Sequence, residues 1–534
     1  MKRILLVISF NFLFFGYLLG SSVNLSTGQN YYINKDFKNA EIYFLKAVNE
    51  DKDYDAYFFL GLLYEQQEKY ELAEKYYKLG VEQGNFHAMN KLGFLYYTQK
   101  RTDLAEKYYL MAYDHGHFPL PLLNLGFLYR DNNKYDLSEK YFKMALELGR
   151  KESLYELAVL YKKQGKFELA EKYYKLTIES GNTVAFNDLG ILYEDQKKYD
   201  LAEKFYKLAI ENKNSYATRN LASLYDKQEK FDLAEKYYKL AIEFGNTDAY
   251  DDLGTIYKNQ KKYDLAEKFY KLGIENEDPY ATRSLGLLYS EQEKFDLAEK
   301  YYKLAVEYGN IDSFNDLGVL YKNQKKYDLA EKFYKLGVEN KDSYAAQNLA
   351  FLYKEQKKID LAEKYYKLAI EYEDADVYYD LGLLYDEQGK TDLAEKYYKL
   401  AIQNEDFEAF NNLGVLYDNQ EKYDLAIKYY LSAIDHNNVN SMFNLALLYQ
   451  NQKKLSLAVK YYELAGQHGS SNAFLQLGYI YYEKNDPETA KKYFKKSVSL
   501  GNQEAKEMLD ELEKGMMERL EGKKKDISTT AYTY

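Results

Sequence analysis

Apolar and polar residues alternate along most of this chain in blocks of 32 or 33 residues, and each block holds two stretches with helical spacing. In residues 54–85, the first stretch places Ala56, Leu60 and Tyr64 on one face, and the second stretch does the same over residues 72–81. Helices this short are unstable in isolation and form only when they pack against neighbours. Each block therefore predicts a helix, a turn, a second helix and a second turn.

The block repeats without a gap. A tyrosine near the end of each first helix marks the period: Tyr64, Tyr96, Tyr129, Tyr161, Tyr193, Tyr225, Tyr257, Tyr289, Tyr321, Tyr353, Tyr385, Tyr417, Tyr449 and Tyr481. Self-similarity at this period is typical of a solenoid. A solenoid offers a long surface and no single enclosed cavity, so binding is a more natural function for it than catalysis.

Small residues follow the same period. Gly61 in the first helix and Ala73 in the second predict a close approach of the two helices, and alanine is the only replacement for the glycine, at Ala158, Ala222, Ala350 and Ala446. Gly84, after the second helix, stands where a helix often ends in a left-handed residue.

These residues resemble the tetratricopeptide repeat family, whose pattern of aromatic, Leu-Gly, Tyr, Ala, aromatic and small residue is matched by Tyr57, Leu60, Gly61, Tyr64, Ala73, Tyr77 and Gly80. The resemblance covers residues 24–520. It implies an all-α, right-handed solenoid of antiparallel helix pairs. The period is 32 rather than about 34 residues, and the closing proline is missing. The shortened junctions resemble Sel-like repeats and imply a different superhelical pitch.

The repeats divide the chain into five segments. The pattern predicts a degenerate N-terminal capping repeat, a regular array that ends with a last second helix opened by Asp486 and Pro487, and a capping helix that carries Ala505, Met508 and Leu509. The predicted boundaries are 1–22 for a signal peptide, 23–53 for the capping repeat, 54–502 for the array, 503–521 for the capping helix and 522–534 for a flexible tail.

The first residues differ in character from the array. Lys2 and Arg3 precede a largely apolar run over residues 4–19, and small residues follow at 20–22. This order is typical of a secretory signal peptide and predicts an exported protein, periplasmic, secreted or at the cell surface. An uncleaved N-terminal anchor and a cytosolic protein are the alternatives, and such an anchor would be the chain's only link to a membrane.

The amino-acid composition excludes several kinds of functional site. There are no cysteines, which removes disulfides and thiolate chemistry, and the net charge of −11 argues against a nucleic-acid partner. His115 and His117 are the only histidines close in sequence, and we interpret them as a solvated loop pair rather than a metal site. No catalytic constellation stands out from the repeat, so the sequence predicts no enzyme, no cofactor and no metal.

By resemblance to the family, the first helices build the inner wall where a partner binds. The candidate residues are Asn187, Arg219, Asp251, Arg283, Asn315, Gln347 and Tyr379, two positions before the leucine, Lys258, Lys322 and Lys354, after the tyrosine, and Phe351 between them. Phe351 belongs to an apolar stripe formed by Leu62, Phe94, Phe127, Val159, Ile191, Leu287, Val319, Phe351, Leu383, Val415 and Leu447, which Ser223 and Thr255 interrupt.

Two interpretations of this face stay open. The apolar stripe forms a groove for a peptide or a partner helix, or the short period packs the first helices tightly enough to bury it. In the second case Arg219, Asp251 and Arg283 form a charge ladder between repeats, worth little per pair.

The sequence thus predicts a non-catalytic protein–protein interaction scaffold, and we expect Arg219, Asp251, Arg283 and Phe351 to matter for binding and not for folding. The alternative is an envelope protein that binds glycan or peptidoglycan, because tyrosine-rich surfaces stack on sugars and the chain has 64 tyrosines. The sequence names neither the partner nor the oligomeric state.

Overall fold

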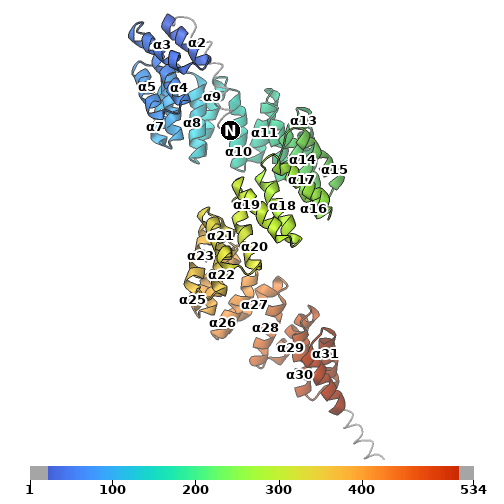
Figure 1. Ribbon diagram of the computed structural model, residues 1–534. Coiled ribbons are helices and arrows are strands. Elements are labelled where there is room, and N and C mark those ends of the chain that lie inside the picture. The colour runs from blue at the N-terminus through green and yellow to red at the C-terminus, as the bar shows by residue number, and fades with distance from the viewer. Residues whose placement is uncertain (1–21, 516–534) are drawn as a thin grey trace, which may run out of the picture. The chain divides into compact units, whose positions relative to one another are not determined.

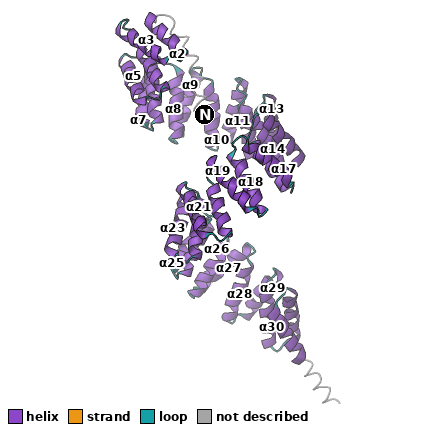
Figure 2. Cartoon of the chain, in the orientation of Figure 1, coloured by secondary structure: helices purple, strands orange, loops and turns teal. Residues whose placement is uncertain are grey.

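The computed structural model describes residues 22–515, and this part of the chain folds into helices joined by short turns, with no strand (Figures 1 and 2). The predicted signal peptide at 1–22, apart from Ser22, and the predicted tail at 522–534 lie outside the described residues. The predicted all-α array of helix pairs is confirmed.

Each repeat contributes a first and a second helix. The first helices are α2 (Val23–Ile33), α4 (Ala56–Gln66), α6 (Phe86–Thr98), α8 (Pro119–Asp131), α10 (Glu152–Lys163), α12 (Ala185–Asp195), α14 (Ser215–Lys227), α16 (Ala249–Asn259), α18 (Pro279–Glu291), α20 (Ser313–Asn323), α22 (Ser343–Glu355), α24 (Val377–Glu387), α26 (Glu408–Asn419), α28 (Val439–Asn451) and α30 (Ser471–Glu483). The second helices are α3 (Phe37–Asn49), α5 (Tyr70–Glu82), α7 (Thr102–Gly116), α9 (Tyr135–Glu147), α11 (Phe167–Glu179), α13 (Tyr199–Glu211), α15 (Phe231–Glu243), α17 (Tyr263–Ile274), α19 (Phe295–Glu307), α21 (Tyr327–Glu339), α23 (Ile359–Glu371), α25 (Thr391–Gln403), α27 (Tyr423–Asp435), α29 (Leu455–Gln467) and α31 (Pro487–Ser499).

The turns inside the repeats end the helices in one recurrent geometry. After α4, Glu68 takes a left-handed conformation (φ 60°), its N–H donates to Glu65 O at 3.0 Å, and the N–H of Lys69 donates to Tyr64 O at 2.9 Å. This hydrogen-bond pair is a Schellman motif, which satisfies the last carbonyls of the helix. The left-handed glycine predicted after the second helix is confirmed at Gly84 (φ 79°). Lysine or glutamate fills the same place in many other turns.

The core of each repeat forms where a tyrosine of the second helix lies against the glycine of the first. At Gly414 in α26, an added Cβ would stand 2.6 Å from the Tyr430 ring of α27. The ring, rather than close backbone approach, therefore sets the steric limit at this position. Ala222, which fills the same position in α14, is fully buried.

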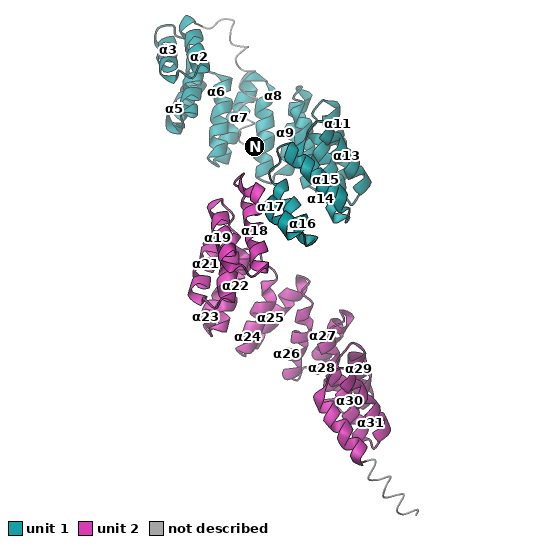
Figure 3. Cartoon of the chain, turned by 45° about the vertical axis from the view of Figure 1, so that its right-hand side comes forward, with its two compact units in different colours: residues 1–269 teal, residues 270–534 magenta. Residues whose placement is uncertain are grey.

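The chain divides into two compact units, residues 1–269 and 270–534, and the boundary falls inside α17 (Figure 3). In the second unit, α31 begins at Pro487 as predicted, and its N-cap Asp486 accepts a hydrogen bond from the backbone N–H of Thr489. Residues 503–515 form a further helix, in which Ala505, Met508 and Leu509 pack on the cluster around Phe494. Only this part of the predicted capping helix at 503–521 is described.

Candidate functional site

The first helices of neighbouring repeats contact each other directly. Such contacts join α4 with α6 and α12 with α14 in the first unit, and α20 with α22, α24 with α26 and α26 with α28 in the second. All of the extensive contacts between helices two places apart join first helices. In a curved array the more closely spaced layer lies on the inner side, so the exposed face of the first helices is the candidate inner wall of each unit.

The apolar stripe on this face is not buried. Phe351 and Leu447 are 41% and 40% exposed, and the other members are half-buried, except Leu62, which is buried. The interpretation that the short period buries the stripe is therefore wrong. The second unit carries an unbroken stripe from Leu287 to Leu447, whereas Ser223 and Thr255 end the stripe of the first unit.

The polar residues beside the stripe form a ladder between repeats. The residue two places before the leucine contacts the residue one place before the leucine of the next repeat. Asn220 Nδ2 donates to Asn187 Oδ1 at 3.0 Å, and Asn348 Nδ2 donates to Asn315 Oδ1 at 2.9 Å. We call this row the inter-repeat ladder. It continues with Gln347 Nε2 donating to Asp380 Oδ2 at 3.0 Å and Asn412 Nδ2 donating to the Tyr379 hydroxyl at 3.2 Å.

Both candidate arginines belong to this ladder. Arg219 binds Asp252 at 2.5 Å and Asp248 at 3.1 Å, and Arg283 binds Asp316 at 2.6 Å and Asp312 at 3.2 Å. The predicted ladder Arg219–Asp251–Arg283 is corrected: each arginine pairs with the carboxylates 29 and 33 residues onward. Adjacent positions on a helix point about 100° apart, so Asp252, and not Asp251, faces Arg219.

Burial raises the pKa of two aspartates in the inter-repeat ladder. It raises the pKa of Asp316, and the neighbouring Arg283 only partly offsets the effect. Burial also raises the pKa of Asp380, against the hydrogen bond from Gln347. These carboxylates lie between repeats and depend on their partners, so we expect the ladder residues to contribute to folding.

The positions after the tyrosine form a second row of contacts between repeats. Lys322 Nζ lies 3.4 Å from Glu355, and Lys354 Nζ lies 2.8 Å from Glu387. Lys322 Nζ also lies 4.0 Å from the centre of the Phe351 ring, so these two candidate residues are brought together. The remaining candidates, Asp251 and Lys258, lie half-buried on α16.

Sequence reasoning missed the acceptors of the ladder. Asp252, Asp316 and Asp380 stand one place before the leucine, and each receives its donor from the previous repeat. Polar residues do recur at the position before the leucine, and this recurrence could have pointed to the acceptors. The sequence gives no reason, however, to pair that position with a donor of the preceding repeat.

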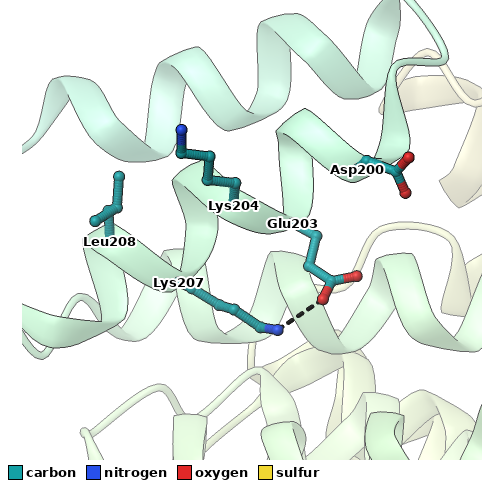
Figure 4. A pocket seen from close by; sticks show the side chains of 5 residues that line it. All are labelled: Asp200, Glu203, Lys204, Lys207 and Leu208. Atoms are coloured by element: carbon teal, nitrogen blue, oxygen red, sulfur yellow. Dashed lines mark hydrogen bonds and ion pairs between the residues drawn. The ribbon is translucent and has the colours of Figure 1, made fainter.

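A shallow hollow on α13 does not bring residues of different repeats together as the inter-repeat ladder does. Asp200, Glu203, Lys204, Lys207 and Leu208 line about 350 Å³ and all come from this one helix (Figure 4). Its ion pair, Lys207 with Glu203 at 2.6 Å, recurs in many repeats, for example as Lys239 with Glu235. The hollow is a solvated helix face.

The two histidines close in sequence have local partners. His115 Nδ1 lies 2.9 Å from Met111 O, and His117 takes the left-handed position that ends α7. Within residues 22–515 no group of three or more histidine, aspartate or glutamate side chains is arranged to hold a metal ion. In the same part of the chain, every helix is too short or too polar to span a bilayer.

The repeated helix pairs define a helical repeat protein, and comparison with family models gives its family. Models described as tetratricopeptide repeat match residues 54–83, 123–185, 155–217, 220–244, 247–278, 284–308, 311–344, 343–376, 375–405, 407–438, 439–465 and 471–503. The chain belongs to the tetratricopeptide repeat family. No curated protein matches the chain.

Solved structures of other helical repeat proteins are similar to this chain. One is described as Naa15/Naa10 bound to HypK-THB (14% identity, 93% of this chain and 97% of that chain, TM-score 0.38). Another is a Sel1 repeat protein from Oxalobacter formigenes (16% identity, 52% of this chain and 89% of that chain, TM-score 0.39). A third is the yeast Tom70 (17% identity, 81% of this chain and 96% of that chain, TM-score 0.34). At these sequence identities and TM-scores the solved structures do not assign a family, so the assignment rests on the family models alone.

Proposed function

We propose that this protein is an exported, non-catalytic scaffold that binds a peptide or helix of a partner protein on the exposed face of its first helices. The observation that carries the proposal is the unbroken apolar stripe of the second unit, with Phe351 and Leu447 about two-fifths exposed. An exposed apolar row at helical-repeat spacing suits the apolar face of an extended or helical partner segment.

The polar contacts between repeats reduce the number of candidate residues that are available to a partner. Arg219, Arg283, Asn187, Asn315 and Gln347 already have partners in the neighbouring repeat. Their primary role in our proposal is to fix the spacing of the first helices. The apolar stripe, with Phe351 at its centre, then supplies the contact surface.

Export rests on the order of residues at the N-terminus. Lys2 and Arg3, the apolar run over residues 4–19 and the small residues at 20–22 support a cleavable signal. Expression of the full chain in a bacterial host, followed by N-terminal mass spectrometry of the periplasmic and cytoplasmic fractions, tests this part. Export predicts a mature protein that lacks about the first 22 residues. An uncut chain in the cytoplasmic fraction would contradict it.

The binding surface is tested by site-specific photocrosslinking in the full chain. A photoreactive residue at 351 or 447 should link one reproducible protein from cells of the native source. Matched controls at 361 and 457 replace leucines that are also 37–38% exposed but lie on the second helices α23 and α29. The proposal fails if the controls link the same protein as efficiently as positions 351 and 447.

A second candidate function is glycan binding. Tyr216, Tyr280 and Tyr344, near the starts of α14, α18 and α22, are 61–66% exposed, and aromatic rings of this kind stack on sugar faces. Sedimentation with insoluble peptidoglycan tests it. Retention of the intact chain that is lost on changing these three tyrosines to serine would favour the glycan function over the scaffold.

A further inference from the structure

The inner face of the second unit changes in charge along its length. Arg283, Lys322 and Lys354 place a cation on each of α18, α20 and α22. The next three first helices, α24, α26 and α28, contain no lysine or arginine. The first helices α24, α26 and α28 therefore contribute no cation to the face on which the apolar stripe is exposed.

Two carboxylates of α24 and α26 stand out in this half. Asp386 and Asp418 occupy the position after the tyrosine, next to stripe residues Leu383 and Val415. In the preceding two repeats the same position holds Lys322 and Lys354, each paired with a glutamate of the next repeat. A negative charge replaces a positive one at the same place on the face.

The partners recorded for these carboxylates are tyrosine hydroxyls. The Tyr398 hydroxyl donates to Asp386 Oδ2 at 3.3 Å, and the Tyr430 hydroxyl donates to Asp418 Oδ2 at 3.5 Å. No ion pair to either aspartate is found among residues 22–515. By contrast, Glu387, the neighbour of Asp386, is neutralised by Lys354 at 2.8 Å. Half-buried carboxylates gain most from a cation that arrives with a binding partner, because the partner also excludes water.

We propose that the surface formed by Leu383, Asp386, Val415, Asp418 and Leu447 docks a basic amphipathic segment of the partner protein. Apolar side chains of that segment lie on the stripe, and its lysine or arginine side chains reach Asp386 and Asp418. The inference rests on the proposed scaffold function and adds the charge of the partner to it. Charge complementarity of this kind selects the partner and speeds its association.

Two designed helical peptides test the charge. Both carry the same leucine stripe; one has lysine and arginine on its polar face and the other has glutamate. Binding of each labelled peptide to the full chain is followed by fluorescence anisotropy at low and at high salt. We expect the basic peptide to bind and the acidic peptide to bind at least roughly tenfold more weakly, with the difference shrinking as salt screens the charges.

Charge-matched variants locate the site. Asp386→Asn with Asp418→Asn should weaken the basic peptide roughly tenfold, since both charge contacts are lost. Asp392→Asn with Asp424→Asn removes the same charge from exposed positions on the second helices α25 and α27 and should leave binding unchanged. Equal losses in both pairs, equal binding of the two peptides, or no binding of either would overturn the inference.

The proposed scaffold function has a separate readout. If crosslinks from positions 351 and 447 identify a partner whose bound segment is acidic or neutral, the charge inference is wrong and the scaffold function stands. If those positions give no more crosslinks than the controls at 361 and 457, the scaffold function itself fails.

Discussion

The two units share one scaffold but present different surfaces. In both, an arginine of a first helix reaches two carboxylates of the next repeat, Arg219 in the first unit and Arg283 in the second. In the second unit the stripe beside this ladder is continuous, whereas Ser223 and Thr255 interrupt it in the first. Folding thus depends on contacts that recur between repeats, and the surface depends on positions that vary between them, the stripe and the residue after the tyrosine.

The shared positions explain why the surface can vary. The stripe residues of the second unit are partly exposed, and the rings that lie against the repeat glycines come from other positions. A substitution there changes what a partner meets and leaves the core intact. The following predictions, from the largest effect to the smallest, test this separation in each unit.

We expect the greatest loss of stability from breaking the ladder in the second unit. Arg283→Ala should cost about 3 kcal/mol, because it strands Asp316, whose side chain is only 10% exposed. Arg219→Ala in the first unit should cost about half as much, about 1.5 kcal/mol, because the side chain of Asp252 is 22% exposed. Urea unfolding followed by circular dichroism measures both.

The ladder prediction has an internal control. Adding Asp316→Asn to Arg283→Ala removes the stranded charge and should recover part of the loss. A cost below about 0.5 kcal/mol for Arg283→Ala would show that the pair is only a surface contact.

The first unit should be the more sensitive to acid. The His87 ring packs against Phe58, Phe86 and Phe118, with ring centres 4.2–5.6 Å apart, and burial lowers its pKa to about 4. The folded state binds this proton less readily than the unfolded state, so the stability present above about pH 6.5 is lost as the pH falls toward 4. The loss attributable to His87 should reach about 3 kcal/mol at pH 4.

Unfolding measured between pH 7 and 4 tests this sensitivity. His87→Phe should remove that part of the pH dependence. His436, exposed in the second unit, provides the control: His436→Gln should leave the acid-induced loss unchanged. An unaltered pH profile in His87→Phe would contradict the prediction.

Converting the stripe of the second unit to the polar character of the first should affect binding and not folding. Phe351→Ser should weaken binding of the partner segment by about 1.4 kcal/mol, a factor of ten, because the most exposed residue of the stripe is lost. Thr255→Leu in the first unit should not change the affinity. Titration monitored by anisotropy measures both variants, and a melting temperature lowered by Phe351→Ser would contradict the separation.

The smallest effect should be the same in both units. Lys357 and Glu229 both take a left-handed conformation with φ 59°, which glycine adopts more easily than residues with a side chain. Lys357→Gly and Glu229→Gly should each stabilise the protein by about 0.5 kcal/mol. Thermal melts compare them, and a gain in one unit with a loss in the other would show that the turns are not equivalent.

Much of the fold follows from local patterns. The helix pairs, the left-handed Gly84 and the start of α31 at Pro487 are set by residues close in sequence, and the structure confirms all three. The candidate residues were also placed on the correct helices. Their roles were less predictable: one interpretation assigned Arg219 and Arg283 to binding and the other to a charge ladder through Asp251, and the structure pairs each arginine with carboxylates of the following repeat.

The sequence by itself determined the repeat and its two helices, because both depend on periodicity and on short-range turn chemistry, and the family resemblance indicated the candidate row of residues on the first helices. Only the tertiary structure decided that Arg219 meets Asp252 instead of Asp251, and that Phe351 and Leu447 stay exposed. Both outcomes depend on the rotation and spacing of one first helix against the next. That geometry is set by how the helices of successive repeats pack against one another, which the pattern within a single repeat does not encode.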